Sequence, residues 1–292
     1  MKKAFLQLHT AVFLAGFTAI LGKLINLNEG LLVWYRLFFS CIILAIILFL
    51  RKKLQKISFK DFLEISVVGF ILAVHWVTFY GSVKYANASV AVVCISAAGF
   101  FSSIIEPLFF RKKMVWIELA LGLLSMLGIY VIFDFHPHYK VGVIFGIISA
   151  IGSATFPIFN KRLLNRFTPE TLTLNEFFGG LIALSFVLPF YFIFYKPDYF
   201  VPTAIDLKWL FILVVFCTVL AFDLQLNALK KISAFTSNLT FNLEPLYGII
   251  LAFVVFNENK MLNNHFYMGL MLIVLSIVLQ MIRVLYSKKY SN

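Results

Sequence analysis

Long apolar stretches joined by short polar connectors constrain this sequence more than any other feature. A membrane-spanning helix needs about 20 mostly apolar residues, and ten stretches of that kind lie at residues 4–24, 30–50, 62–82, 87–110, 114–134, 140–160, 172–195, 207–229, 233–256 and 264–286. Unbroken apolar runs differ from the alternating pattern of a transmembrane barrel. With 62% hydrophobic and 13% charged residues, the chain also departs strongly from soluble domains. The sequence therefore predicts an all-α integral membrane protein of ten transmembrane helices.

The basic residues predict the orientation of these helices. If the even-numbered connectors and both termini share one side, that side collects 18 Lys and Arg, and the other side has 6. Basic residues favour the cytoplasmic side, so we expect a multi-pass protein of the inner (cytoplasmic) membrane with both termini in the cytoplasm. The apolar run after Met1-Lys2-Lys3 is long for a signal peptide and is interpreted as an uncleaved first helix.

Charge and motifs exclude several classes of function. The net charge is +12, but the basic residues stand in short runs between apolar stretches, so no nucleic-acid partner is expected. Cys41, Cys94 and Cys217 lie far apart inside apolar stretches and are interpreted as buried thiols. The fifth connector has Asp134, His136 and His138, too few ligands for a metal site. Phosphate-loop, nucleophile-elbow and zinc-protease motifs are absent, and we expect no enzyme, cofactor or metal.

A weak internal repeat relates the two halves. A shift of 146 residues places Gly81–Tyr85 on Asn227–Lys231 and Ala98-Gly99 on Glu244-Pro245. A shift of 138 places Lys23 on Lys161. The sequence thus predicts two five-helix repeats, residues 1–136 and 137–292. Because five is odd, the repeats are expected to be inverted, an arrangement common in secondary transporters.

The chain combines ten predicted helices and this duplication with Lys23 after the first stretch, Arg36 in the second and Glu244-Pro245 in the ninth. In these features the chain resembles the drug/metabolite transporter superfamily, specifically its EamA-type members. The resemblance covers the whole chain. It implies export of amino acids or similar small metabolites, and it implies that Arg36 lies at the cavity. The first half departs from the family pattern, because Gly99 stands where a proline is usual and Glu106-Pro107 follows one or two turns later.

Charged groups inside the stretches need a reason, because a charge at mid-bilayer costs about 2.5–3.5 kcal/mol on insertion scales. Glu106, Glu176 and Arg36 lie within about two turns of a helix end. Two interpretations stay open for them: the side chain reaches the lipid headgroups, or it lies inside the protein. For Arg36, the neighbours Trp34 and Tyr35 favour the headgroup level, whereas the family resemblance favours the cavity.

Polar residues near mid-depth are the candidates for a substrate cavity. His75 stands beside Trp76, with Phe79 and Tyr80 following; a structural hydrogen bond and a ligand or proton role are both open for it. The other candidates are polar residues of the eighth and ninth stretches, namely Asp223, Asn227, Asn238, Asn242 and Glu244. Interhelical hydrogen bonding is the alternative for the asparagines. Pro245 frees the carbonyl of Phe241, which favours a cavity.

These observations favour a secondary carrier that works by alternating access, with stretches 1–4 and 6–9 around the cavity and stretches 5 and 10 as peripheral scaffold. The predicted substrate is a small metabolite, and an aromatic, weakly charged lining suits a zwitterion with an apolar side chain. Membrane lipid is the other expected partner; proton coupling through His75 or Glu244, facilitated diffusion and a homodimer stay open. The competing functions are a non-transporting membrane scaffold or assembly protein and an intramembrane enzyme.

Overall fold

Helices make up the regular structure of the computed structural model, which describes residues 2–53, 55–134, 139–232, 237, 240–241, 243–260 and 262–289. In chain order they are α1 (Lys2–Gly16), α2 (Thr18–Leu24), α3 (Glu29–Leu50), α4 (Phe59–Tyr85), α5 (Ala88–Ile95), α6 (Ala98–Phe110), α7 (Trp116–Asp134), α8 (Lys140–Leu163), α9 (Pro169–Phe194), α10 (Ala204–Val214), a π-helix η2 (Val215–Leu220), α11 (Ala221–Leu229), α13 (Glu244–Phe256), a 3₁₀-helix η3 (Glu258–Lys260) and α14 (Asn264–Lys289). These described residues contain no strand.

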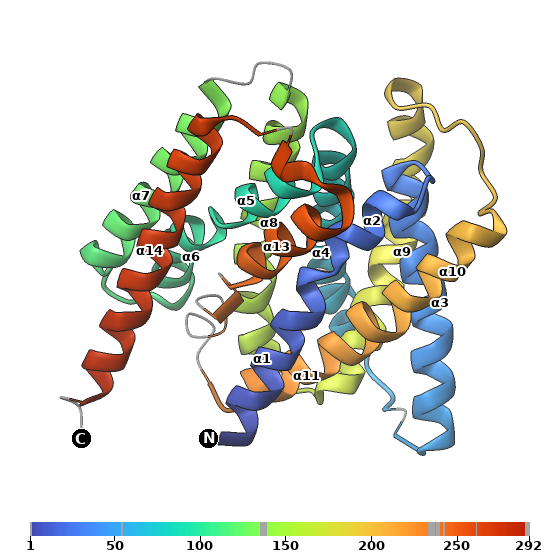
Figure 1. Ribbon diagram of the computed structural model, residues 1–292. Coiled ribbons are helices and arrows are strands. Elements are labelled where there is room, and N and C mark those ends of the chain that lie inside the picture. Colours follow the sequence, from blue (N-terminus) through green and yellow to red (C-terminus); the bar gives the residue numbers. More distant parts are fainter. Residues whose placement is uncertain are drawn as a thin grey trace.

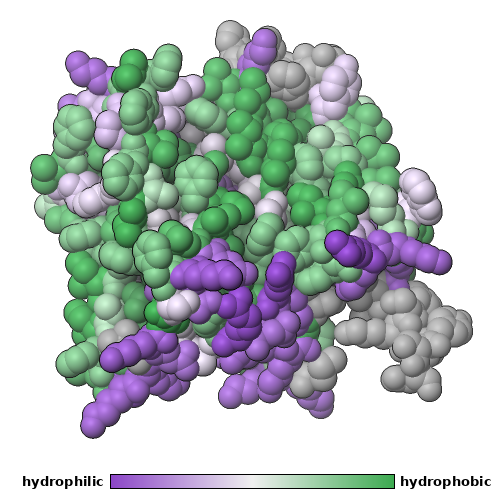
Figure 2. All heavy atoms as spheres, turned by 180° about the vertical axis from the view of Figure 1, so that it is seen from behind, coloured by the Kyte–Doolittle hydropathy of each residue, from purple (hydrophilic) through white to green (hydrophobic). Residues whose placement is uncertain are grey.

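The predicted ten-helix membrane fold is confirmed. Within the described residues, eight helical stretches are long and apolar enough to cross a membrane, and two shorter apolar helices, Trp116–Ile132 and Glu244–Phe256, account for the fifth and ninth predicted helices. The start of α1 and the end of α14 lie at the same end of the bundle (Figure 1). In Figure 2, hydrophobic side chains cover much of the surface above, and hydrophilic side chains gather at that end.

Two predicted continuous helices are interrupted. The first stretch is divided into α1 and α2 at Phe17, and the fourth into α5 and α6 at Ser96 and Ala97. At the second break the Ser96 hydroxyl donates to the Val93 carbonyl (2.6 Å), and the Ala97 amide bonds three residues back to Cys94. Hydroxyl groups that bond to nearby carbonyls compete with regular helix geometry. Hydropathy cannot reveal such breaks, because both sides of each break are equally apolar.

Two helices that correspond at the shift of the proposed repeat have the same length. The shift of 146 residues places Ala98 on Glu244 and Phe110 on Phe256, which are the first and last residues of α6 and α13. Both helices end at a left-handed residue with φ 52°, Arg111 and Asn257. Equal lengths and equal terminations at one constant shift are what an ancient duplication produces. The predicted boundary between residues 136 and 137 itself lies outside the described residues.

Helix packing follows the same relation. The contacts of α3 with α9 and of α7 with α14 each join equivalent helices of the two proposed repeats, and α5 with α13 joins the fourth span to the ninth. In the same way, α4 packs on α8 as α11 packs on α1. The α7–α14 pair stands at one side of the bundle (Figure 1). Its two helices cross so closely that a Cβ on Gly128 would lie 2.6 Å from the Gly269 carbonyl oxygen. The other helices surround the centre of the molecule.

Candidate functional site: a central cavity around Arg36

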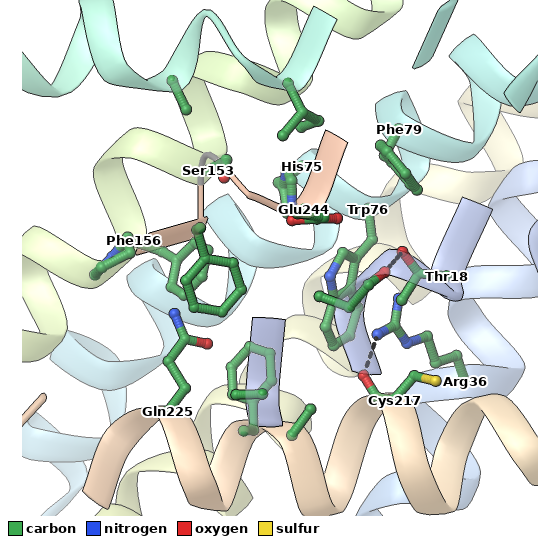
Figure 3. A pocket seen from close by; sticks show the side chains of 18 residues that line it. Thr18, Arg36, His75, Trp76, Phe79, Ser153, Phe156, Cys217, Gln225 and Glu244 are labelled. Atoms are coloured by element: carbon green, nitrogen blue, oxygen red, sulfur yellow. Dashed lines mark hydrogen bonds between the residues drawn. The ribbon is translucent and has the colours of Figure 1, made fainter. Parts of the chain in front are cut away.

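A cavity of about 70 Å³ lies at the centre of the bundle. Its lining comes from seven of the ten helical stretches: Ala11, Ala15, Thr18, Arg36, His75, Trp76, Phe79, Ile95, Ala98, Ser153, Phe156, Pro157, Cys217, Ala221, Phe222, Gln225, Phe241 and Glu244. Figure 3 shows Arg36 on one side of this space, with Trp76 and Glu244 between it and Phe156. Drug-sized ligands need pockets of roughly 300–1,000 Å³, so the cavity in this conformation suits a small ligand.

Arg36 is the most strongly held polar group of the cavity. Only 2% of its surface is exposed. Its Nε donates to the Thr218 hydroxyl (2.8 Å), Nη1 donates to the Tyr80 hydroxyl (2.9 Å) and Nη2 donates to the Cys217 carbonyl (3.2 Å). The guanidinium carbon lies 3.6 Å from the centre of the Trp76 ring, a cation–π contact. The headgroup interpretation of Arg36 is therefore wrong, because this side chain is anchored inside the protein.

A π-helical turn builds half of this anchor. The segment η2 interrupts the eighth span, and the Thr218 hydroxyl donates to the Leu213 carbonyl, five residues earlier (2.8 Å). The same hydroxyl oxygen accepts from Arg36. Short π-helical turns are rare and frequently occur at functional sites. Here the wider turn provides a hydroxyl and a carbonyl oxygen for one guanidinium group.

His75 joins two helices and keeps one ring nitrogen for the cavity. Its Nδ1 lies 2.8 Å from the Ser149 carbonyl oxygen of α8, and the Ser149 hydroxyl donates to the His75 carbonyl (2.9 Å). A carbonyl oxygen only accepts, so Nδ1 carries the hydrogen and Nε2 of the neutral ring is an acceptor. Nε2 has no protein partner among the described residues. The structure therefore contains the predicted structural hydrogen bond and still leaves an atom for a ligand.

Glu244 is the acidic group of the cavity. It is half-buried at the start of α13 and faces the same space as Arg36 and His75 (Figure 3). It makes no hydrogen bond or ion pair within the part of the chain that the structure describes. The predicted cavity residues Asn238 and Asn242 lie outside the described residues, as do His136 and His138 of the fifth connector.

The other predicted site residues divide into two groups. Trp76 and Phe79 line the cavity, and Tyr80 lies behind it, fully buried against Arg36. Asp223 and Asn227 bond to each other (3.0 Å) and do not line the cavity. Gln225, which stands between them in sequence, lines it instead.

Gln225 and Thr218 were missed by the sequence interpretation, although helical spacing contained a signal for them. Thr218, Phe222 and Gln225 follow each other at four and three residues, the spacing of one helix face. Asp223 and Asn227 lie on a different face. The charged Asp223 favoured the face with Asn227 in the sequence interpretation, whereas the cavity lies against the less polar face, which carries Gln225.

Glu106 and Glu176 occupy the ends of two spans and differ in their surroundings. The Glu106 carboxylate lies 3.9 Å from the Lys112 Nζ at the end of α6. Glu176 is fully buried between α9 and its neighbours. The headgroup interpretation is therefore wrong for Glu176, and the structure places neither residue in the cavity.

Three curated proteins are similar to this chain along most of its length. An uncharacterized transporter of Bacillus subtilis, YetK, is 26% identical over 272 residues, covering 87% of this chain and 80% of that protein. An uncharacterized transporter of Haemophilus influenzae is 23% identical over 275 residues, covering 88% and 86%. One of Archaeoglobus fulgidus is 29% identical over 193 residues, covering 65% and 68%.

One solved crystal structure matches the whole fold. It covers 100% of both chains with a TM-score of 0.70 at 14% sequence identity, so the two proteins share their architecture. At the level of sequence, the EamA-like transporter family matches residues 2–134 and, a second time, residues 140–282. The chain is thus a membrane transporter and belongs to the EamA-like transporter family of the drug/metabolite transporter superfamily.

Proposed function

We propose that this protein exports small zwitterionic metabolites, such as amino acids, across the cytoplasmic membrane by alternating access of the cavity around Arg36. One observation carries the proposal. Arg36 is a buried cation, and no Asp or Glu oxygen of the described residues lies within 4.0 Å of it. Its hydrogen bonds go to neutral groups only. Glu244, the acidic group of the cavity, interacts with Arg36 only at longer range, so a carboxylate of the substrate would supply a direct ionic partner.

The remaining lining fits the rest of such a molecule. Glu244 and the free Nε2 of His75 offer acceptors to a substrate ammonium group. Trp76, Phe79 and Phe156 offer apolar surface to the carbon skeleton. The proposed inverted repeats would allow inward-open and outward-open states of similar energy. The direction, export, rests on the similarity to EamA-type transporters.

The test is counterflow into liposomes that contain the purified protein, with radiolabelled amino acids as probes. We expect wild-type protein to accumulate at least one amino acid. Replacing Arg36 with Ala removes the carboxylate partner and should lower transport about tenfold or more, because hydrogen bonds to charged groups contribute about 1.5–3 kcal/mol each. Arg283→Ala is the matched control, since Arg283 pairs with Glu118 between α14 and α7 (3.0 Å), away from the cavity.

If wild-type protein accumulates none of the amino acids tested, the proposed substrate class is contradicted and a scaffold function is favoured. Equal loss of transport in Arg36→Ala and Arg283→Ala would show that Arg36 acts through stability alone. Proton coupling is tested separately, because His75 and Glu244 are the titratable groups of the cavity besides Arg36 and Cys217. Transport that responds to a pH gradient in wild type but not in a His75→Asn, Glu244→Gln double variant would assign the proton to this pair.

A further inference from the structure

The cavity has a second polar end, which Arg36 and Glu244 do not explain. Gln225 rises from α11 on the side of the cavity away from Arg36, and Trp76 lies between the two (Figure 3). Its side chain is only 4% exposed. Its amide makes no hydrogen bond with any described residue. An amide that faces the cavity without a protein partner is available to a ligand, and hydrogen bonds from the ligand would stabilise the complex.

Ser153 of α8 adds further hydrogen-bonding atoms to the same cavity; in Figure 3 it lies beside His75, and Phe156 lies between it and Gln225. Its hydroxyl has no hydrogen-bond partner among the described residues. Pro157 stands four residues later in the same helix. Because proline has no N–H, the Ser153 carbonyl lacks its helical hydrogen bond. Carboxamide and hydroxyl groups donate and accept, so this end of the cavity offers both functions.

The charge of this end determines the class of group that fits. Neither Gln225 nor Ser153 is ionisable, and the aromatic residues Phe156 and Phe222 line the same cavity. A charged group placed here would lose its hydration without gaining an opposite charge. A neutral group that both donates and accepts would satisfy the Gln225 amide, and the Ser153 hydroxyl offers a second hydrogen bond in the same cavity.

We propose that Gln225, supported by Ser153, selects the substrate by binding a neutral hydrogen-bonding group of its side chain, so that the transported class is small zwitterions with a carboxamide or hydroxyl in the side chain. This inference rests on the proposed function, in which Arg36 holds the substrate carboxylate. The inference refines the expectation of an apolar side chain. The aromatic rings of the cavity contact the carbon skeleton of the substrate, and Gln225 forms hydrogen bonds with the polar end of the substrate side chain.

Selectivity follows from the cost of leaving the site unpaired. A site built to hydrogen-bond a polar group rejects an analogue of equal size that lacks the group, because the buried protein atoms then have no partner. One lost hydrogen bond of about 1.4 kcal/mol corresponds to a tenfold change in apparent affinity. We therefore expect about tenfold preference for the polar member of a size-matched pair.

Counterflow competition tests this with two pairs of unlabelled probes of similar size, asparagine against leucine and glutamine against methionine. Wild-type protein should be inhibited about tenfold better by the amide member of at least one pair. Gln225→Leu should bring that ratio close to one by weakening the amide and strengthening the apolar probe. Ser153→Ala, on another helix, should reduce the ratio in the same direction. Gln280→Leu is the control, since Gln280 is equally buried (3% exposed) in α14 away from the cavity.

The outcomes separate the two proposals. Transport with no amide preference, or with a preference that Gln225→Leu and Ser153→Ala both leave intact, would overturn the role of Gln225 while the amino-acid carrier stands. A complete absence of amino-acid counterflow in wild type would overturn the carrier and this inference with it. If Gln225→Leu does not fold, the Ser153→Ala ratio decides alone.

Discussion

Buried charged side chains in this protein are stabilised in different ways. Arg36 has three hydrogen bonds and an aromatic face. Glu258, at the predicted outer end, is also fully buried, and it accepts from Lys23 Nζ (2.7 Å), from the Ser89 hydroxyl (2.6 Å) and from the amides of Ala88 and Ser89 (3.2 and 2.9 Å). Glu176, in contrast, faces the neutral side chain of Asn160, and neither of its oxygens makes a well-formed hydrogen bond within the described part of the chain. Only the first two groups have surroundings that stabilise a charge.

The two glutamates should therefore respond oppositely to the same substitution. Glu258→Gln removes the charge that pairs with Lys23 and leaves at least one donor unmatched, so we expect the free energy of unfolding to fall by about 1–3 kcal/mol. Glu176→Gln replaces a buried carboxyl group that has no charged partner among the described residues with a neutral group of the same shape, which can still face Asn160, so stability should stay constant or rise. Thermal unfolding of the purified variants in one detergent measures both. A loss in Glu176→Gln as large as that in Glu258→Gln would show that the Glu176 carboxylate has a stabilising partner.

Single residues also show how far sequence reasoning reached. The position of Arg36 within its helix identified it as an unusual charged residue but did not decide between the lipid headgroups and the protein interior. The distance from a helix end is the same for a side chain that faces lipid and for one that faces protein. The choice of Asp223 and Asn227 instead of Gln225 had a similar cause. Polarity identifies residues that need a partner, whereas which helix face meets the cavity depends on the packing of helices distant in sequence.

At the scale of elements, apolar length predicted all ten helices, and of their interruptions only the one at Glu244-Pro245 had a signal in the sequence, the proline itself. The cavity is lined by residues at or next to each interruption. These interruptions are the breaks at Phe17 and Ser96, the π-helix η2 and the start of α13 at Glu244. Irregular backbone inside a membrane is tolerated where it is enclosed by protein or lines a cavity. Hydropathy averages over about 20 residues, and a local change in hydrogen bonding does not alter the average. The interruptions at Phe17, Ser96 and η2 could therefore not be recognised from hydropathy, although residues beside them line the cavity.

The π-helix leads to a prediction about Thr218. Valine has the shape of threonine but cannot accept from Arg36 or donate to Leu213, whereas serine keeps both hydrogen bonds. A buried donor without a partner costs about 1–3 kcal/mol, so Thr218→Val should raise the substrate concentration for half-maximal counterflow about 5- to 100-fold, and Thr218→Ser should stay close to wild type. Gel filtration of each variant checks that it remains folded. Wild-type kinetics in Thr218→Val would show that the Arg36 anchor does not depend on this hydroxyl.

At the scale of the whole molecule, an even number of spans places both ends of the chain on one side (Figure 1), and the asymmetry of Lys and Arg predicts that this side faces the cytoplasm. The protein offers a convenient background for testing this assignment by thiol labelling. Its three cysteines, Cys41, Cys94 and Cys217, are all buried, with at most 9% of their surface exposed. A single introduced cysteine would therefore dominate the reaction with a maleimide.

Two exposed positions on opposite sides decide the orientation. Asp198 lies in the connector between α9 and α10, and Asn165 lies in the connector between α8 and α9. Since one span, α9, separates these connectors, they must face different compartments. In intact cells, a membrane-impermeant maleimide should label Asp198→Cys and should label Asn165→Cys only after permeabilisation, while the unsubstituted protein stays unlabelled in both conditions. The reverse pattern would invert the orientation, and equal labelling of both positions before permeabilisation would mean that α9 does not cross the membrane, which would remove the inverted arrangement on which alternating access depends.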